Sequence, residues 1–421
     1  MSARKLKSDP FVAYEYEESV AQEQVLANAA LLTVLLGLSC GVMVTLPLWS
    51  NDTDARSGFP LVPILVDWSA VIPDAVFDCL PLLVIALSAA LALSLARDMR
   101  TRVKGRPLLA LIVLLVFLVV GDYSRLQPWI YQYAWSLLVA LLLRRDATAQ
   151  LDVLHAIIAC VIFWAGFHKF TPSFAAVLTY TSRPLTDLLG INPDAVAALA
   201  PVAAFAETLM GVMLWFEQTR FVGAVLGIGM FSFLLCMLGP LGLNVNEAIW
   251  PWNVVMISLL GLVFAWRKQR PTSVVHRLRR TSRANMPIVL VVALFFAVAP
   301  AFHLVGTWDS YMSFSLYTGN SPHERVTVSP ELLAHFPDLQ AFSWNENETG
   351  RSGVSVFNWS FAAIRAPIYL ERRVFLRAYR QLCAKARHDD DLQFSVWSWQ
   401  PMLVAGDGNE PQKGNCASFR D

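Results

Sequence analysis

Charged residues are scarce in this sequence. Aspartate, glutamate, lysine and arginine make up 15% of its 421 residues, against about a quarter in an average soluble domain. The two signs nearly cancel, giving a formal net charge of +1, and this balance argues against a nucleic-acid partner, which would require a basic surface. Apolar residues make up 56% of the chain and gather in long blocks. The sequence therefore predicts an integral membrane protein whose main partner is the lipid bilayer.

Common chemical motifs are also missing. The sequence contains no P-loop, no HExxH zinc-binding helix and no Gly-rich dinucleotide turn. Its six cysteines include no CxxC pair, which disfavours a thioredoxin-like role. Nothing in the sequence therefore predicts nucleotide chemistry or a metal site.

Nine apolar runs approach the roughly 20 helical residues that cross a hydrocarbon core about 30 Å thick. These runs are residues 25–49, 77–96, 107–121, 128–143, 151–170, 194–216, 221–241, 247–266 and 286–305. The third and fourth runs are short, so eight spans is the alternative count. We expect an all-α polytopic membrane bundle of about nine transmembrane helices over residues 25–305, preceded by a polar arm at residues 1–24.

Basic residues set the expected orientation. One set of alternate loops carries the basic start of the chain and the clusters at residues 97–106 and 267–283, whereas the opposite loops carry few basic residues. Because basic loops remain on the cytoplasmic side, we expect a cytoplasmic N-terminus and, with nine spans, an extracytoplasmic C-terminus. A bacterial inner membrane fits this arrangement.

The character of the sequence changes near residue 306. We expect residues 306–421 to form a small α+β extracytoplasmic domain, to which a partner protein could bind. Alternating patterns and an amphipathic pattern predict strands at 310–317, 353–357 and 392–399 and a helix within 367–386. Cys383 and Cys416 lie in this part and could form a disulfide if it faces an oxidising compartment.

His168 and Lys169 stand side by side at the end of the fifth run (FWAGFHKF, residues 163–170). Ionisable residues in a membrane-length segment are costly and mark candidate functional sites. Lys169 has two interpretations: it extends to the lipid headgroups, or it is partly desolvated and acts as a general base. A cationic His168 would assist the second role. Glu207, inside the sixth run, should face the bundle interior, paired or protonated.

Further residues are candidates for lining a cavity at the same end of the bundle. They are Asp122, Arg125, Trp164, Glu247, Trp252 and Asn253. A plainer interpretation is an ion pair between Asp122 and Arg125 in one outer turn. The residues around Glu247 could equally anchor a helix at the headgroups.

Two motifs resemble the HTTM family, the horizontally transferred transmembrane domain shared with vitamin K-dependent gamma-carboxylase. The first motif is Phe163–Trp–Ala–Gly–Phe–His–Lys169, and the second is Glu207–Thr–Leu–Met–Gly211. The resemblance covers roughly residues 25–265 and implies that Lys169 is a base that deprotonates a reduced, vitamin K-like quinone. The chain differs from the family at residues 234–237, which lack the histidine that is frequent there.

Three functions are open from the sequence. The first is a carboxylase-like, quinone-dependent membrane enzyme that uses Lys169, with His168 and Glu207, at the outer face. The second is a non-catalytic membrane subunit that binds a partner through its outer domain. The third is a transporter in which Glu207 titrates, although the sequence shows none of the internal repeats that many transporters contain.

Overall fold

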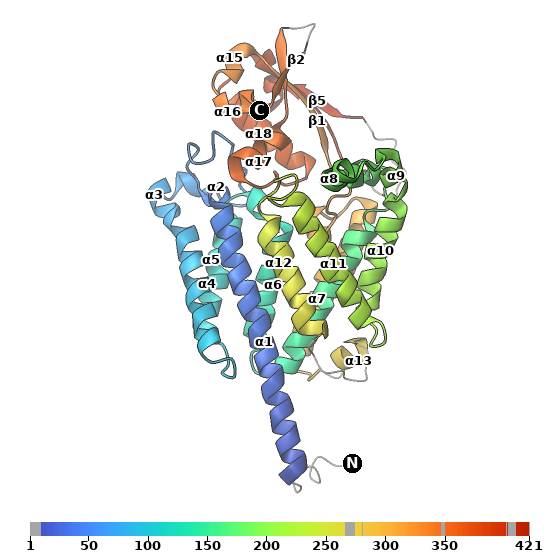
Figure 1. Cartoon of the computed structure of the whole chain (residues 1–421). Helices are drawn as coiled ribbons and strands as arrows, with labels where there is room; N and C mark the ends of the chain where they lie inside the picture. The colour runs from blue at the N-terminus through green and yellow to red at the C-terminus, as the bar shows by residue number, and fades with distance from the viewer. Residues whose placement is uncertain are drawn as a thin grey trace.

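The computed structural model describes residues 10–265, 274–279, 281–346, 350–400, 402 and 410–420. Its helices form a bundle, and a domain built on a β-sheet stands on one end of that bundle (Figure 1). We call this domain the sheet domain and the end of the bundle beneath it the sheet-domain end.

Helices occupy each of the nine predicted apolar runs. They are α1 (Pro10–Val44), α4 (Cys79–Arg97), α5 (Gly105–Val119), α6 (Pro128–Leu142), α7 (Ala147–Phe167), α10 (Ala200–Met213), α11 (Arg220–Leu238), α12 (Ile249–Leu260) with η3 (Gly261–Ala265), and α14 (Met286–Ala293) with η4 (Leu294–Val298) and η5 (Ala299–Val305). Helix α1 begins well inside the segment predicted as a polar arm. Short helices connect these elements: α2 (Leu46–Trp49), α3 (Asp74–Phe77) and α13 (Val274–Arg279).

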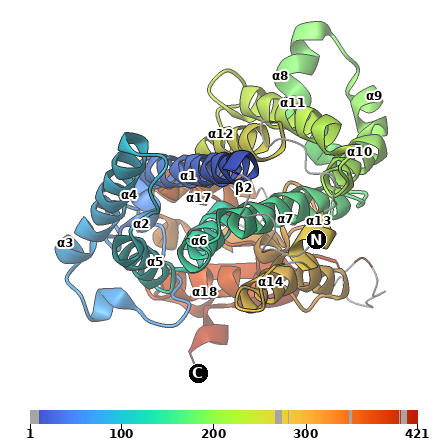
Figure 2. The ribbon, with the colours of Figure 1, turned by 90° about the horizontal axis from the view of Figure 1, so that it is seen from below.

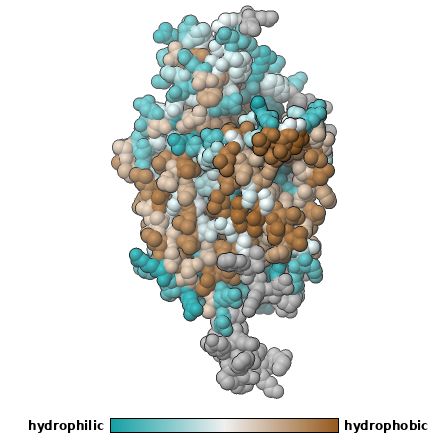
Figure 3. Space-filling view, viewed as in Figure 1, coloured by the Kyte–Doolittle hydropathy of each residue, from teal (hydrophilic) through white to brown (hydrophobic). Residues whose placement is uncertain are grey.

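Among the described residues, five helical segments are long and apolar enough to cross a membrane. They are Val20–Val44, Asp74–Arg97, Ala147–Phe167, Arg220–Leu238 and Met286–Val305, and shorter apolar helices accompany them. The visible side of the bundle carries a band of apolar side chains between polar ends (Figure 3). The chain is therefore a multi-pass membrane protein. The number of spans is five if only the long helices cross the membrane, and it approaches the predicted nine if the shorter helices cross as well.

Helix α7 lies inside the bundle, between α1, α6 and α10 (Figure 2). Every residue from Ala149 to Ile162 is buried, as expected for a helix that is apolar on all sides. Its buried acidic residue, Asp152, accepts a hydrogen bond of 2.8 Å from Arg277 Nε of α13. Helix α7 therefore provides a rigid support for the residues at its sheet-domain end.

The sixth predicted run is not one continuous helix. It is divided between α9 (Pro193–Ala198) and α10, which starts at Ala200, because a proline in the first turn of each of these two helices favours a new helix start. Before this run the chain forms a further helix, α8 (Phe174–Leu189). Helix α8 lies across the sheet-domain end (Figure 1), and its exposed residues include Leu188 and Leu189. Such an amphipathic helix is typical of a membrane interface, and the sequence analysis did not predict it.

The sheet domain contains a five-stranded antiparallel sheet in the order β2–β3–β1–β4–β5. The strands are β1 (His323–Val328), β2 (Ser343–Glu346), β3 (Arg351–Val354), β4 (Leu392–Trp397) and β5 (Gln412–Asn415), and the helices are α15 (Pro330–Leu333), α16 (Pro337–Gln340), α17 (Val356–Ile364) and α18 (Arg372–Cys383). The predicted strand at 392–399 and the helix within 367–386 are confirmed. The strand predicted at 353–357 is displaced, because Ser355 caps α17 by accepting a hydrogen bond from the Asn358 amide.

The strand predicted at residues 310–317 is wrong. Tyr311–Ser313 form a 3-10 turn, and Phe314 and Tyr317 have φ angles of 57° and 54°, which break an extended strand. The alternating pattern suggested a strand with one buried face. In the structure, aromatic side chains from both alternating sets of residues are buried, including Tyr311 and Phe314. The segment packs between the bundle and the sheet domain.

Candidate functional site

Two glycines bring the backbones of α7 and α10 into direct contact. A Cβ atom on Gly166 would lie 2.3 Å from the Thr208 backbone nitrogen, and one on Gly211 would lie 2.4 Å from the Phe163 nitrogen. Small residues at a crossing of membrane helices allow this close approach. The crossing places the end of α7, with Lys169, beside Glu207 of α10.

Lys169 and Glu207 form a buried ion pair. The Lys169 Nζ donates a hydrogen bond to Glu207 Oε2, and the side chains are only 9% and 11% exposed. The Lys169 Nζ also lies 5.7 Å from the ring centroid of Phe174 at the start of α8. The lysine therefore does not extend to the lipid headgroups, and the predicted pairing of Glu207 inside the bundle is what the structure contains.

A cavity of about 30 Å³ adjoins this ion pair. It is lined by Val161, Ile162, Ala165, Lys169, Glu207, Phe231, Leu234, Ile249, Trp252, Asn253, Leu316 and Tyr317. The Asn253 side chain is 2% exposed, and its Nδ2 has no hydrogen-bond partner in the described part of the chain. A buried amide nitrogen without a partner is costly, and this one belongs to a residue that lines the cavity.

His168 belongs to a different group of aromatic side chains. Its ring stacks on Trp164 at 5.3 Å between centroids and meets the His303 ring edge-on at 4.8 Å. The His303 ring lies 3.9 Å from that of Trp399, which follows β4. His168 does not line the cavity beside Lys169. It joins α7 to the last membrane helix and the sheet domain.

Asp122 and Arg125 have structural roles. Asp122 pairs with Arg56 at 2.7 Å, with both side chains fully buried, so the predicted Asp122–Arg125 ion pair is replaced by a different one. The Arg125 guanidinium donates hydrogen bonds to the carbonyls of Leu48, Trp49, Ser50 and Leu118 and to Asn51 Oδ1. It therefore satisfies the carbonyls left free at the ends of α2 and α5.

The remaining cavity candidates separate into two groups. Trp252 and Asn253 line the cavity at the ion pair, and Trp252 Nε1 donates to Gln132 Oε1 at 2.8 Å. Glu247 instead lies 3.5 Å from Arg365 of the sheet domain. Trp164 lines an apolar groove of about 410 Å³ on another side of α7, together with Cys160, Phe163, Val212, Trp215, Phe216, Val275 and Ala297.

A second cavity, of about 240 Å³, lies between the bundle and the sheet domain. Ile249, Trp252, Leu316 and Tyr317 line both this cavity and the one at the ion pair. We call the larger one the interdomain cavity. Sequence reasoning missed Leu316 and Tyr317, because their segment was assigned to a strand of a separate domain.

Cys383 and Cys416 form a disulfide that joins α18 to the end of the chain. No group of three or more histidine, cysteine, aspartate or glutamate side chains that could hold a metal ion occurs among the described residues. Gly37–Leu–Ser–Cys–Gly41 matches the GxSxG spacing of nucleophile elbows, but it lies inside α1, where Ser39 Oγ donates to the Leu35 carbonyl at 3.0 Å. It therefore lacks the strand–turn–helix geometry of an elbow.

Comparison with protein families, with curated proteins and with solved structures gave no match to this chain.

Proposed function

We propose that this membrane protein is an enzyme in which the Lys169–Glu207 pair removes a proton from a weakly acidic group of a lipophilic substrate. The observation that carries the proposal is the burial of this pair beside a cavity that is also lined by Asn253, whose buried Nδ2 has no partner among the described residues. A structural ion pair needs neither a cavity nor an unsatisfied donor next to it.

The proposed reaction begins with the movement of one proton within the pair. Transfer from the Lys169 ammonium to the Glu207 carboxylate leaves an amine and a carboxylic acid. The Lys169 amine then takes the proton of the substrate hydroxyl, which leaves a substrate anion beside a new ammonium. In the proposed reaction, Asn253, which lines the same cavity, turns its Nδ2 to donate a hydrogen bond to that anion.

The resemblance of the Lys169 and Glu207 motifs to the HTTM family makes a reduced quinone the candidate substrate. A cavity of about 30 Å³ has room for about one water molecule or one hydroxyl group, not for a quinol ring. The residues at the pair therefore fit only the acidic group of such a substrate.

The proposed orientation follows from the basic loops and places Lys169, Glu207 and the sheet domain on the extracytoplasmic side. The disulfide between Cys383 and Cys416 supports this orientation, because disulfides persist in oxidising compartments. A bacterial inner membrane remains the proposed location.

The test compares purified protein carrying a Lys169→Met, Glu207→Gln double substitution with the unchanged chain. The double substitution avoids leaving one buried charge unpaired. We expect it to abolish quinol-dependent turnover while the chain stays folded, and we expect lipid extraction with mass spectrometry to find a quinone in the unchanged protein. Equal turnover in both proteins would refute the proposal.

A second candidate function is a non-catalytic subunit that binds a partner protein. The observation that favours it is a cleft of about 920 Å³ on one face of the sheet, lined by side chains that include Arg325, Thr327, Gln393, Ser395 and Lys413. A partner protein that co-purifies with the chain, and that is lost when Arg325 and Lys413 are changed to glutamate, would support this function. Retention of the partner by that variant would exclude this face as its binding site.

A further inference from the structure

Four residues line both the cavity at the Lys169–Glu207 pair and the interdomain cavity. They are Ile249, Trp252, Leu316 and Tyr317. The first two belong to α12, whereas the last two lie in the irregular segment between η6 (Tyr311–Ser313) and β1. The cavity at the pair, of about 30 Å³, has room for about one water molecule, so a larger group reaches the pair only if some of these residues move. Leu316 and Tyr317 can do so without displacing a membrane helix.

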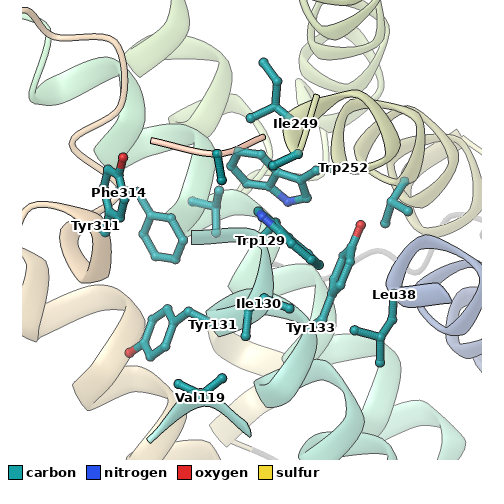
Figure 4. Packing of buried hydrophobic residues seen from close by; sticks show 14 of the residues in the cluster. Leu38, Val119, Trp129, Ile130, Tyr131, Tyr133, Ile249, Trp252, Tyr311 and Phe314 are labelled. Atoms are coloured by element: carbon teal, nitrogen blue, oxygen red, sulfur yellow. The ribbon is translucent and has the colours of Figure 1, made fainter. Parts of the chain in front are cut away.

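Left-handed backbone conformations mark both ends of this segment. Phe314 has a φ angle of 57° and Gly319 one of 69°. The Phe314 side chain is fully buried and lies in the packed cluster of the bundle, 5.9 Å from Tyr131 between ring centroids (Figure 4). A Cβ atom on Gly319 would lie 2.6 Å from the Ser173 carbonyl oxygen, so Gly319 lies directly against the connection between α7 and α8. Residues 315–318, which we call the strap, therefore run between two anchored ends.

Backbone strain is concentrated where the strap meets the bundle. Six non-glycine residues of the described chain have positive φ angles, and four of them lie here: Phe314 and Tyr317 in this segment, and Asn244 and Asn246 in the loop before α12. Asparagine tolerates this conformation, but a bulky residue such as tyrosine rarely adopts it. Strained residues persist only where surrounding contacts hold them, and they cluster at ligand clamps and switches. The contacts that hold Tyr317 therefore decide whether the strap stays in place.

Two hydrogen-bonded latches hold the strap. The Asn246 Nδ2 donates a hydrogen bond of 2.8 Å to the Tyr317 hydroxyl. On the other side, Thr171 Oγ1 donates to the Thr318 carbonyl at 2.9 Å, and Ser173 Oγ lies 3.3 Å from the same carbonyl. The second latch joins the strap to the chain segment that follows the proposed base. Each latch is a side-chain hydrogen bond of modest net stability, so it can break without the unfolding of a helix.

We propose that the strap is a gate, which closes the cavity at the Lys169–Glu207 pair in this structure and opens it into the interdomain cavity when both latches break. The interdomain cavity, of about 240 Å³, has room for a group that the smaller cavity excludes. The gate gives the proposed reaction its entrance, and in that respect it rests on the proposed function. Its opening is a movement of the strap, however, and can be measured without turnover.

The test measures access to the cavity at the pair by labelling a cysteine placed in it. Ala165→Cys introduces a thiol at a residue that lines this cavity and is 7% exposed. The full chain in lipid nanodiscs is treated with iodoacetamide, which is small, uncharged and water-soluble, and peptide mass spectrometry follows each cysteine. Cys160 is the internal control, because it is buried on the same helix and lines the apolar groove instead of this cavity. We expect slow labelling of the introduced cysteine in the otherwise unchanged chain.

Matched variants connect the labelling to the two latches. Tyr317→Phe removes the hydroxyl of the first latch and keeps the ring, and Thr171→Val removes the hydroxyl of the second and keeps a similar shape. Each should raise the labelling rate of the introduced cysteine about fivefold, the value expected for one lost hydrogen bond when labelling requires the strap to open first. The double variant should raise it about 25-fold, because one opening breaks both latches. Tyr379→Phe is the control: it loses a hydrogen bond to Glu324 inside the sheet domain and should leave the rate unchanged.

The outcomes that would overturn the gate are distinct. Unchanged labelling in both Tyr317→Phe and Thr171→Val would show that the latches do not close the cavity. An equal rise at Cys160 would show general unfolding in place of a local opening. Labelling by the lipid-soluble reagent N-phenylmaleimide but not by iodoacetamide would place the entrance in the bilayer and overturn the route through the interdomain cavity. Turnover is a separate measurement: its retention in the Lys169→Met, Glu207→Gln protein would refute the proposed function and leave the gate in place.

Discussion

Gly166→Ala should open the crossing of α7 and α10. The new Cβ would lie 2.3 Å from the Thr208 nitrogen, whereas ordinary contact begins at 3.4 Å. The two backbones would therefore have to separate by about 1 Å, because the atom that is met belongs to the backbone and cannot rotate away. Overpacking of this kind costs about 1–3 kcal/mol of unfolding free energy.

Gly229→Ala in α11 is the control for this prediction. A Cβ at Gly229 meets no atom within 4 Å, so this change should stabilise the helix by up to about 1 kcal/mol. Both variants are measured by equilibrium unfolding in mixed micelles. If Gly166→Ala is as stable as Gly229→Ala, the close crossing is not required and the reasoning fails.

The same change should also weaken the Lys169–Glu207 pair. Its hydrogen bond joins the two helices one turn beyond the glycine contact, and a shift of about 1 Å takes a hydrogen bond outside its normal range of distances. A double-mutant cycle between Lys169→Met and Glu207→Gln should therefore show a smaller coupling energy in the Gly166→Ala background than in the unchanged chain. An equal coupling energy would show that the pair does not depend on this crossing.

Three further predictions concern stability. Replacing Cys383 and Cys416 with serine opens a loop with a sequence separation of 33 residues and should lower the free energy of unfolding by about 3–4 kcal/mol. A thermal melt should show this as a lower melting temperature. Reductant should lower the melting temperature of the unchanged chain by the same amount and should not affect the serine variant. Asp122→Ala leaves the buried Arg56 charge without its counter-ion and should lower the free energy of unfolding by about 3–5 kcal/mol. A joint Arg56→Met, Asp122→Leu change should lower it clearly less, and a denaturant titration of both variants measures the difference. Burial raises the pKa of the Glu324 carboxyl above 4.5, so the folded state holds this proton more tightly, and the unfolding free energy should fall as pH rises from about 4.5 through the raised pKa; Glu324→Gln should flatten that slope.

The membrane helices could largely be predicted from the sequence, because hydrophobic length alone specifies a helix in lipid. The same reasoning placed Lys169 near the end of α7 and Glu207 inside its neighbour. It could not place them in contact, since that depends on which faces of two helices meet. Gly166 and Gly211 indicate that each helix can approach a neighbour closely. The sequence does not show, however, that these two glycines belong to the same crossing.

The part of the site that sequence reasoning missed comes from the segment between the bundle and the sheet domain. Residues 310–317 alternate like a strand, yet the helix before them and β1 after them hold them against the bundle. A period of two predicts a strand only where one face is buried and the other is not, and here the aromatic residues of both faces are covered. Leu316 and Tyr317 consequently line both cavities, together with Ile249 and Trp252 of α12. The site at Lys169 is thus completed by residues that follow the last membrane helix. Removing the sheet domain together with this segment should therefore expose the cavity beside the Lys169–Glu207 pair, in addition to removing the surface of the sheet domain.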